Sequence, residues 1–133
     1  MGNYSLAKTW ITIAGVVLVL VGILGFIPNP LVGSEDGALL PTDAVHNVVH
    51  LATGLLALYI AFGMSGANLV NGVIGFGVLY AIILIVVLLS PTLFGLFSVP
   101  ANAALHLIHA ALAVVSLAVG YMARGTADTE VTR

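Results

Sequence analysis

The side chains best suited to chemistry in this sequence are its four histidines, which all lie in two apolar stretches. Residues 45–54 read VHNVVHLATG and residues 101–110 read ANAALHLIHA. Within each stretch the two histidines are three or four positions apart, so a helix would carry both on one face. Imidazole nitrogens ligate haem iron and transition metals, so each pair can contribute to a cofactor site. The candidate ligands are His46, His50, His106 and His109.

The rest of the sequence offers few groups that could assemble a catalytic centre. It has no cysteine, which excludes thiolate metal sites, iron–sulfur ligation and cysteine nucleophiles. No phosphate-binding loop and no set of carboxylate, histidine and hydroxyl partners can be assembled, so we predict that the chain is not an enzyme. The formal net charge of −2 and the absence of a basic run argue against nucleic acid as a partner.

The composition indicates that these histidines belong to an integral membrane protein. The 133 residues are 61% hydrophobic and only 6% charged, whereas about a quarter of the residues of soluble domains are charged. A helix needs about 20 apolar residues to cross a bilayer. Pro28 and Pro91 should end the first and third crossing helices, because proline lacks an amide donor. Four segments are long enough to cross, at residues 9–27, 43–62, 69–89 and 100–123.

The few charged residues predict how these helices are oriented. Lys8 precedes the first segment and Arg124 follows the last, whereas the charged residues of the loop between the first two segments are all acidic. Because basic residues favour the cytoplasmic side, we expect both termini in the cytoplasm. Phe94 and Phe97 should then lie in an outer aromatic belt at the lipid–water boundary. Residues 125–133 should form a short, disordered polar tail.

The two histidine stretches also align with each other as parts of an internal repeat. His46 aligns with Asn102, His50 aligns with His106, and the segments before them align as well. A parallel repeat of helical hairpins is known in membrane proteins. Its pseudo-twofold axis should bring His50 and His106 face to face, near the outer surface of the bundle. The predicted repeats cover about residues 7–66 and 67–124 of a single four-helix domain, 1–133.

Four further polar residues should fix the outer ends of the helices. Thr42 and Ser98 each precede a helix that starts at the outer side, where a hydroxyl can accept a hydrogen bond from a first-turn amide. Asn47 and Asn102 should close the outer loops, alongside histidine rings that are bonded to loop carbonyls. These are structural roles, and they offer an interpretation of the histidines that requires no ligand.

Two motifs make the chain similar to a known family. The motif N-x-x-H-L-x-x-G at residues 47–54 returns as A-x-x-H-L-x-x-A at residues 103–110. A GFIP sequence at 25–28 ends the first segment, and LFGLF at 93–97 precedes the second motif. In these features the chain resembles a family of small bacterial four-span membrane proteins that is catalogued as a domain of unknown function. The resemblance implies an all-α fold of four membrane helices in a bacterial cytoplasmic membrane, and it implies no activity.

Three functions fit these residues, and the first needs no cofactor. The protein would be an accessory or scaffold subunit of a larger membrane complex, surrounded by lipid and bound to other membrane proteins or to further copies of itself. In the second, the four histidines bind haem, a chlorophyll-type pigment or a metal ion in the bundle core. In the third, the chain is a small transporter or channel subunit, although its helices lack the acidic and basic groups that such proteins use. We take the first as the leading hypothesis.

Overall fold

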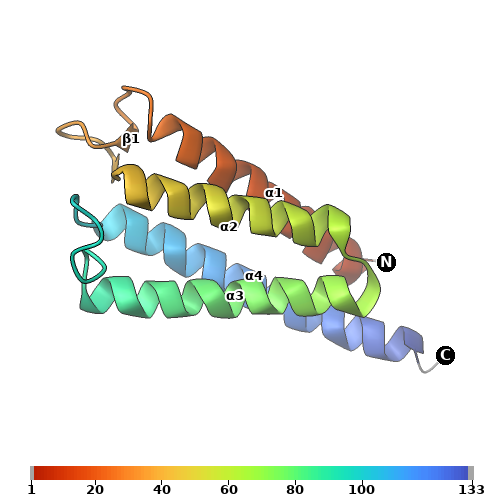
Figure 1. Cartoon of the computed structure of the whole chain (residues 1–133). Coiled ribbons are helices and arrows are strands. Elements are labelled where there is room, and N and C mark those ends of the chain that lie inside the picture. The colour runs from red at the N-terminus through yellow and green to blue at the C-terminus, as the bar shows by residue number, and fades with distance from the viewer. Residues whose placement is uncertain (1, 132–133) are drawn as a thin grey trace.

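A computed structural model shows a bundle of four long helices with two extended loops at one end (Figure 1). The structure describes residues 2–131. The helices are α1 (Gly2–Leu24), α2 (Ala44–Gly63), α3 (Gly66–Leu89) and α4 (Ala103–Val131). The first loop contains two short strands that pair in parallel, β1 (Val32–Gly33) and β2 (Leu40–Pro41). Apart from this small pairing, which the sequence analysis missed, the regular structure of the described residues is helical.

All four helices are long and apolar enough to cross a membrane, which confirms the predicted four-helix membrane protein. Large apolar side chains remain exposed along the outside of the bundle; Leu89, for example, is 79% exposed. A surface of this kind is unfavourable in water, whereas lipid chains are as apolar as leucine and can cover it. The outer faces of the helices are therefore the lipid-facing surface of the protein.

The helix ends between α1 and α4 lie within a few residues of the predicted ones, but α1 begins at Gly2 rather than at residue 9, and α4 also extends further than predicted. α1 ends at Leu24, and α4 begins at Ala103 rather than at Pro100. α4 then continues to Val131. The predicted polar tail at 125–133 thus begins within this helix, which no proline interrupts as far as residue 131. Residues 132 and 133 lie outside the described residues.

Glycines allow the first two helices to pack closely. α1 packs mainly against α2, and α3 mainly against α4. A Cβ atom on Gly54 would lie 2.8 Å from the backbone nitrogen of Val19, and one on Gly15 would lie 3.0 Å from the carbonyl oxygen of Gly54. Small residues at such contacts let helix backbones approach each other in membranes. The contact holds α2, and the histidines that it carries, against α1.

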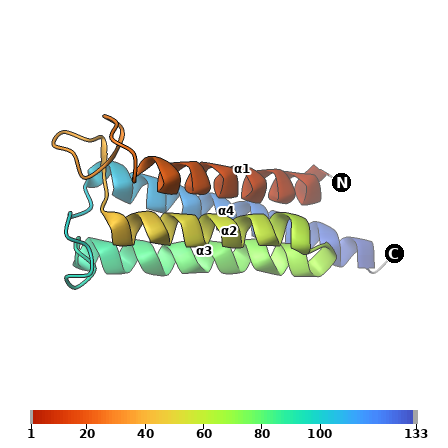
Figure 2. The ribbon, with the colours of Figure 1, turned by 45° about the horizontal axis from the view of Figure 1, so that its top comes forward.

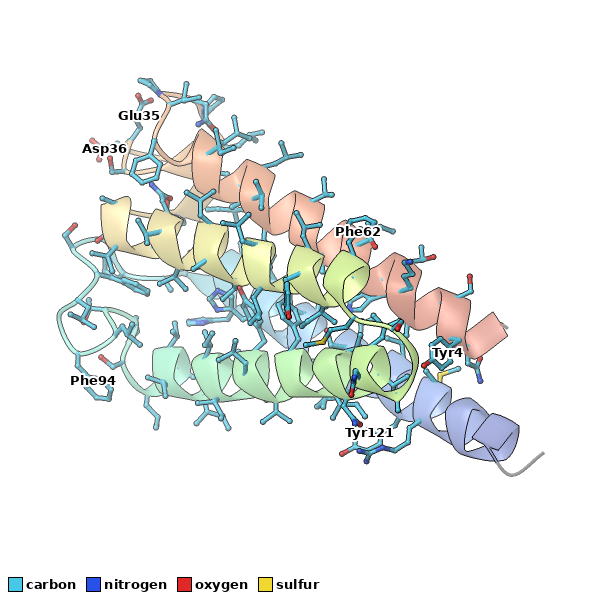
Figure 3. The ribbon with its side chains drawn as sticks, turned by 45° about the vertical axis from the view of Figure 1, so that its right-hand side comes forward. Tyr4, Glu35, Asp36, Phe62, Phe94 and Tyr121 are labelled. Atoms are coloured by element: carbon cyan, nitrogen blue, oxygen red, sulfur yellow. The ribbon has the colours of Figure 1, made fainter. Side chains whose placement is uncertain are left out.

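Both termini lie at one end of the bundle, and the two long loops lie at the other (Figure 2). Glu35, Asp36 and Phe94 are at the loop end, whereas Tyr4 and Tyr121 are near the termini (Figure 3). An even number of crossings produces this arrangement. Which end faces the cytoplasm stays a prediction from the charged residues, and the internal repeat stays a prediction from the sequence.

Candidate metal centre

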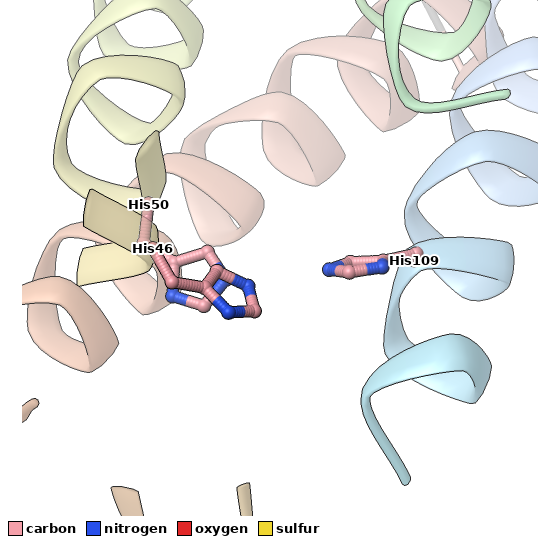
Figure 4. Close-up of side chains that lie close together, drawn as sticks. All are labelled: His46, His50 and His109. Carbon is pink, nitrogen blue, oxygen red and sulfur yellow. The ribbon is translucent and has the colours of Figure 1, made fainter. Parts of the chain in front are cut away.

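Three of the four histidines meet inside the bundle (Figure 4). α2 carries His46 and His50 one turn apart on one face, and α4 presents His109 from the opposite side. One ring nitrogen of each residue lies within 4.8 Å of the other two. All three side chains are buried, with at most 2% of their surface exposed. The fold therefore brings together three candidate ligands from two helices that are distant in sequence.

The three rings contact one another directly. The ring centroids of His46 and His50 are 4.4 Å apart. The centroid of His109 lies 5.9 Å from that of His46 and 6.4 Å from that of His50. One ring nitrogen of each histidine lies within 4.8 Å of the others, so the three nitrogens can be directed toward a common point.

Each of these imidazoles carries a buried polar atom that lacks a hydrogen-bond partner. The Nδ1 atoms of His46, His50 and His109 have none within the described part of the chain. Buried polar atoms are almost always hydrogen-bonded, and leaving one unpaired costs about 1–3 kcal/mol. Three such atoms in adjoining rings indicate a site that a ligand completes.

His106 lies outside this cluster, which corrects the predicted pairing of His50 with His106. His109 faces His46 and His50 instead. Three steps along an α-helix turn a side chain through about 300°, so His106 and His109 point in directions about 60° apart. The repeat alignment assumed that both hairpins present equivalent positions to the interior. The packing of α4 directs the neighbouring histidine inward.

Phe97, in the loop between α3 and α4, covers one side of the cluster. Its ring stacks on the ring of His46, with centroids 4.4 Å apart and planes 3° from parallel. Only 4% of Phe97 is exposed, so its predicted place in a lipid-facing aromatic belt is wrong. The loop that carries it folds back over the start of α2, where burial of the ring is favourable. Phe97 thus keeps water from that side of His46.

Asp43 ties this loop to the start of α2. Its carboxylate accepts a hydrogen bond from the backbone N–H of His46 at 2.9 Å. It also accepts hydrogen bonds from the Ser98 hydroxyl, at 2.8 Å, and from the Ser98 backbone N–H. Burial acts to raise the pKa of the Asp43 carboxyl, but these hydrogen bonds outweigh burial and hold the pKa below its ordinary value of 3.8. The charged carboxylate therefore fastens the segment that follows Phe97.

The structure corrects the predicted helix caps. Asp43 caps α2, one residue after Thr42, whose hydroxyl oxygen is buried and has no hydrogen-bond partner within residues 2–131. Ser98 donates its hydroxyl to Asp43 and does not cap α4. The Asn102 side chain accepts the backbone N–H of Leu105 at 3.1 Å and takes that role. Aspartate and asparagine cap helices at least as well as the predicted hydroxyls.

The two predicted asparagine contacts differ in kind. The Asn102 amide donates to the carbonyl of Leu39 at 3.1 Å, which joins the first loop to the start of α4. Asn47 is buried against Gly25, where an added Cβ atom would overlap the Asn47 side chain. Its side-chain oxygen has no hydrogen-bond partner among the described residues. Asn102 therefore connects the outer loops, whereas Asn47 fills the contact between α1 and α2.

Thr53 and Tyr80 lie one helical turn further into the bundle. Their hydroxyl oxygens are 2.6 Å apart, and the hydrogen bond between them is buried. The ring centroid of Tyr80 lies 6.0 Å from that of His109. The sequence analysis did not assign these residues to the site, because a bond between α2 and α3 leaves no local signal in the sequence. The Thr53 hydroxyl also donates to the backbone carbonyl of Val49 at 2.8 Å, so both hydroxyls are engaged beside the histidines.

A small apolar cavity of about 130 Å³ adjoins His50. It lies between α1 and α4, and every other residue that lines it is a valine, leucine or isoleucine. A cavity of this chemistry stays dry, because a buried water needs about three hydrogen-bond partners. His50 therefore has the other histidines on one side and an apolar space on another.

The spacing of the three histidines is compatible with a metal ion. A zinc or copper ion about 2.0–2.1 Å from each nitrogen holds tetrahedral ligands about 3.4 Å apart, so small side-chain rotations would close the present spacing of at most 4.8 Å. Sites for drug-sized ligands occupy roughly 300–1,000 Å³, and the cavity beside His50 holds only about 130 Å³. The cavity beside His50 is thus smaller than a site for a ligand of that size.

Comparison with known proteins identifies a family. Residues 8–122 match the sequence model of a family described as a domain of unknown function, DUF4383. No curated protein and no solved structure matches the chain. The matched region includes all of α2 and α3 and each of the clustered histidines.

Proposed function

The chain belongs to the DUF4383 family, which is described as a domain of unknown function, and we propose its function from the geometry of the histidine cluster. The protein is a membrane protein that binds a transition-metal ion through His46, His50 and His109. The observation that carries the proposal is the meeting of three buried imidazoles whose Nδ1 atoms lack partners within residues 2–131. Imidazole is a common ligand of zinc and copper, and coordination gives such a nitrogen its partner.

A purely structural role accounts less well for these side chains. A histidine in a membrane span is stabilised when its ring nitrogens hydrogen-bond across helices, and the three Nδ1 atoms of the cluster make no such bond in the described structure. Apolar side chains would fill the same space without burying polar atoms. A role as an accessory subunit of a larger complex is compatible with metal binding. That role, the absence of catalytic activity and the identity of any protein partner stay predictions.

The proposal includes a location for the site. We expect the protein in a bacterial cytoplasmic membrane with both termini in the cytoplasm, because Lys8 lies in the N-terminal part of α1 and Arg124 in the C-terminal part of α4. The start of α2, with His46, lies at the end of the bundle opposite the termini, beside the two long loops. The metal would then reach the cluster from the outer side of the membrane.

Elemental analysis of the purified protein tests the proposal. Protein in detergent is incubated with zinc or with copper under reducing conditions, freed of excess metal and analysed. We expect about one metal ion per chain, and at least tenfold weaker binding after His46→Ala, His50→Ala or His109→Ala, since each removes one of three ligands.

His106→Ala is the matched control for this experiment. It removes an imidazole from the same helix as His109, outside the cluster, and should leave metal binding unchanged. Equal losses in H106A and H109A would place the metal elsewhere. Full metal content in a protein that lacks all three clustered histidines would contradict the proposal.

A further inference from the structure

The histidine cluster (His46, His50 and His109) has one carboxylate near it, that of Asp43, which lies just outside the membrane span of α2 and interacts electrostatically with His46. The four spans that the structure describes contain no aspartate and no glutamate. Asp43, at the start of α2, already accepts hydrogen bonds from the backbone of His46 and from Ser98. The chain also lacks cysteine, so no thiolate is present. An ion in this cluster therefore meets three neutral ligands.

Few polar groups near the histidine cluster are free to hydrogen-bond a water molecule or hydroxide that would serve as a fourth ligand. Zinc sites with three protein ligands complete their coordination with water or hydroxide, and a buried water needs about three hydrogen bonds. The hydroxyls of Thr53 and Tyr80 are bonded to each other at 2.6 Å. Phe97 covers His46, and the cavity beside His50 has no other polar residue in its lining. A hydroxide here would lack the partners that stabilise it.

We propose that the histidine cluster selects a monovalent ion of the Cu(I) type over divalent ions such as Zn(II), an inference that rests on the proposed function. The energy of moving an ion from water into a medium of low dielectric constant rises with the square of its charge, so a divalent ion costs about four times as much. The ion together with its three neutral imidazole ligands carries a net charge of +1 with Cu(I) and +2 with Zn(II), and the Asp43 carboxylate is not one of these ligands. Copper accepts imidazole ligands, and three nitrogens complete a trigonal site without water.

Competition between ions tests this inference on the full chain in detergent, under reducing and oxygen-free conditions. Cu(I), Ag(I) as its redox-inert counterpart, and Zn(II) are added singly and in competition, and bound metal is measured. We expect Cu(I) and Ag(I) to bind at about one ion per chain and to remain bound against a hundredfold excess of Zn(II). Displacement by an equal concentration of Zn(II) would overturn the inference and leave the proposed function intact. Failure of all three ions to bind would instead contradict the proposed function.

A pair of variants at position 53 tests whether the charge of the surroundings causes the expected preference for monovalent ions. Thr53→Asp and Thr53→Asn both disturb the bond to Tyr80 and are nearly equal in size, but only T53D places a carboxylate one turn from His50. We expect T53D to raise the preference for Zn(II) over Cu(I) at least tenfold, and T53N to leave it near that of the unaltered protein. Equal selectivity in the two folded variants would contradict the charge argument. The competition on the unaltered protein decides the inference whether or not T53D folds.

Discussion

At the scale of single residues, the unpaired ring nitrogens are the physical reason for the proposed metal site. The Nδ1 atoms of His46, His50 and His109 are buried without partners in the part of the chain that the structure describes. A folded chain without metal bears this cost, which is about 1–3 kcal/mol for each atom. A bound ion stabilises the folded state by mass action. The stability of the protein should therefore report on the site.

Replacing one proposed ligand by an apolar residue should separate the cost of an unpaired ring nitrogen from the stabilisation that bound metal provides. We expect His50→Leu to raise the free energy of unfolding of the metal-free protein by about 1 kcal/mol, because it removes an unpaired polar atom. The same variant should lose most of the increase in melting temperature that added metal produces. Thermal unfolding in detergent, with and without metal, measures both quantities.

His106→Leu is the control for this prediction. It also removes a buried Nδ1 atom without a described partner, but from a residue outside the cluster. It should keep the full response to metal. A metal-free H50L protein that is clearly less stable than the unaltered one would show that the imidazole of His50 is held by contacts other than a metal.

At the scale of elements, the start of α2 and the loop after α3 act together to form the site. Asp43 caps α2 and holds Ser98, the residue next to Phe97, while Phe97 covers His46. The orientation of His46 and the cover over it thus depend on one carboxylate. Substitutions of Asp43, or of residues in the contact between α1 and α2, should change the stability of the protein without replacing a proposed metal ligand.

The Asp43 carboxylate should make stability depend on pH. Its folded-state pKa lies below the ordinary value of 3.8, so it contributes stability above about pH 4 and loses that contribution as the pH falls through the folded-state pKa. Loss of a helix cap costs about 1 kcal/mol, and we expect Asp43→Ala to lower stability by about that amount or somewhat more at neutral pH. Melting temperatures from pH 7 to pH 3 should converge for the variant and the unaltered protein. A constant difference over this range would contradict the role of the charge.

The contact between α1 and α2 should not tolerate a side chain at Gly54. A Cβ atom there would lie 2.8 Å from the backbone nitrogen of Val19, which cannot move without shifting α1. We expect Gly54→Ala to destabilise the protein by about 1–3 kcal/mol, as overpacking does. Gly75→Ala is the matched control, since nothing lies within 4 Å of a Cβ there. G75A should be neutral or stabilising by up to about 1 kcal/mol, and equal effects of the two would show that the close contact is unimportant.

At the scale of the whole molecule, the bundle places both termini at one end and the histidine-bearing start of α2 at the other. The apolar outer faces anchor this arrangement in lipid. In the predicted orientation, in which the loops face outward, a metal that arrives from outside the cell would meet the loops before it meets the membrane core. The orientation of the bundle therefore determines whether a metal would reach the proposed site from the cytoplasm or from outside the cell.

Single cysteines can establish the orientation, because the chain has none of its own. We expect Glu35→Cys, in the first loop, to react in intact cells with a maleimide that does not cross membranes, because this loop should face outward. Ser65→Cys, in the turn between α2 and α3, should react only after the cells are opened. Both residues are exposed in the structure. The reverse pattern would place the termini and Lys8 outside the cell.

The sequence by itself determined that the chain forms four helices and that these helices cross a membrane. It also determined the set of candidate ligand residues. In lipid, each crossing segment must satisfy its own backbone hydrogen bonds, so length and hydropathy within one segment suffice to predict a helix. The confirmed all-α membrane fold follows from this local rule. The four histidines could also be recognised within single segments, because they are polar rings in segments that are otherwise apolar.

Only the tertiary structure decided which histidines meet and what surrounds them. The sequence paired His50 with His106, whereas α4 turns His109 toward His46 and His50. The stacking of Phe97 on His46 likewise joins residues of different segments. The rotation of a helix about its own axis is set by the side chains packed against it, and a local pattern contains no information about those neighbours. For that reason a sequence of this kind predicts candidate ligands, and the packed bundle selects three of them.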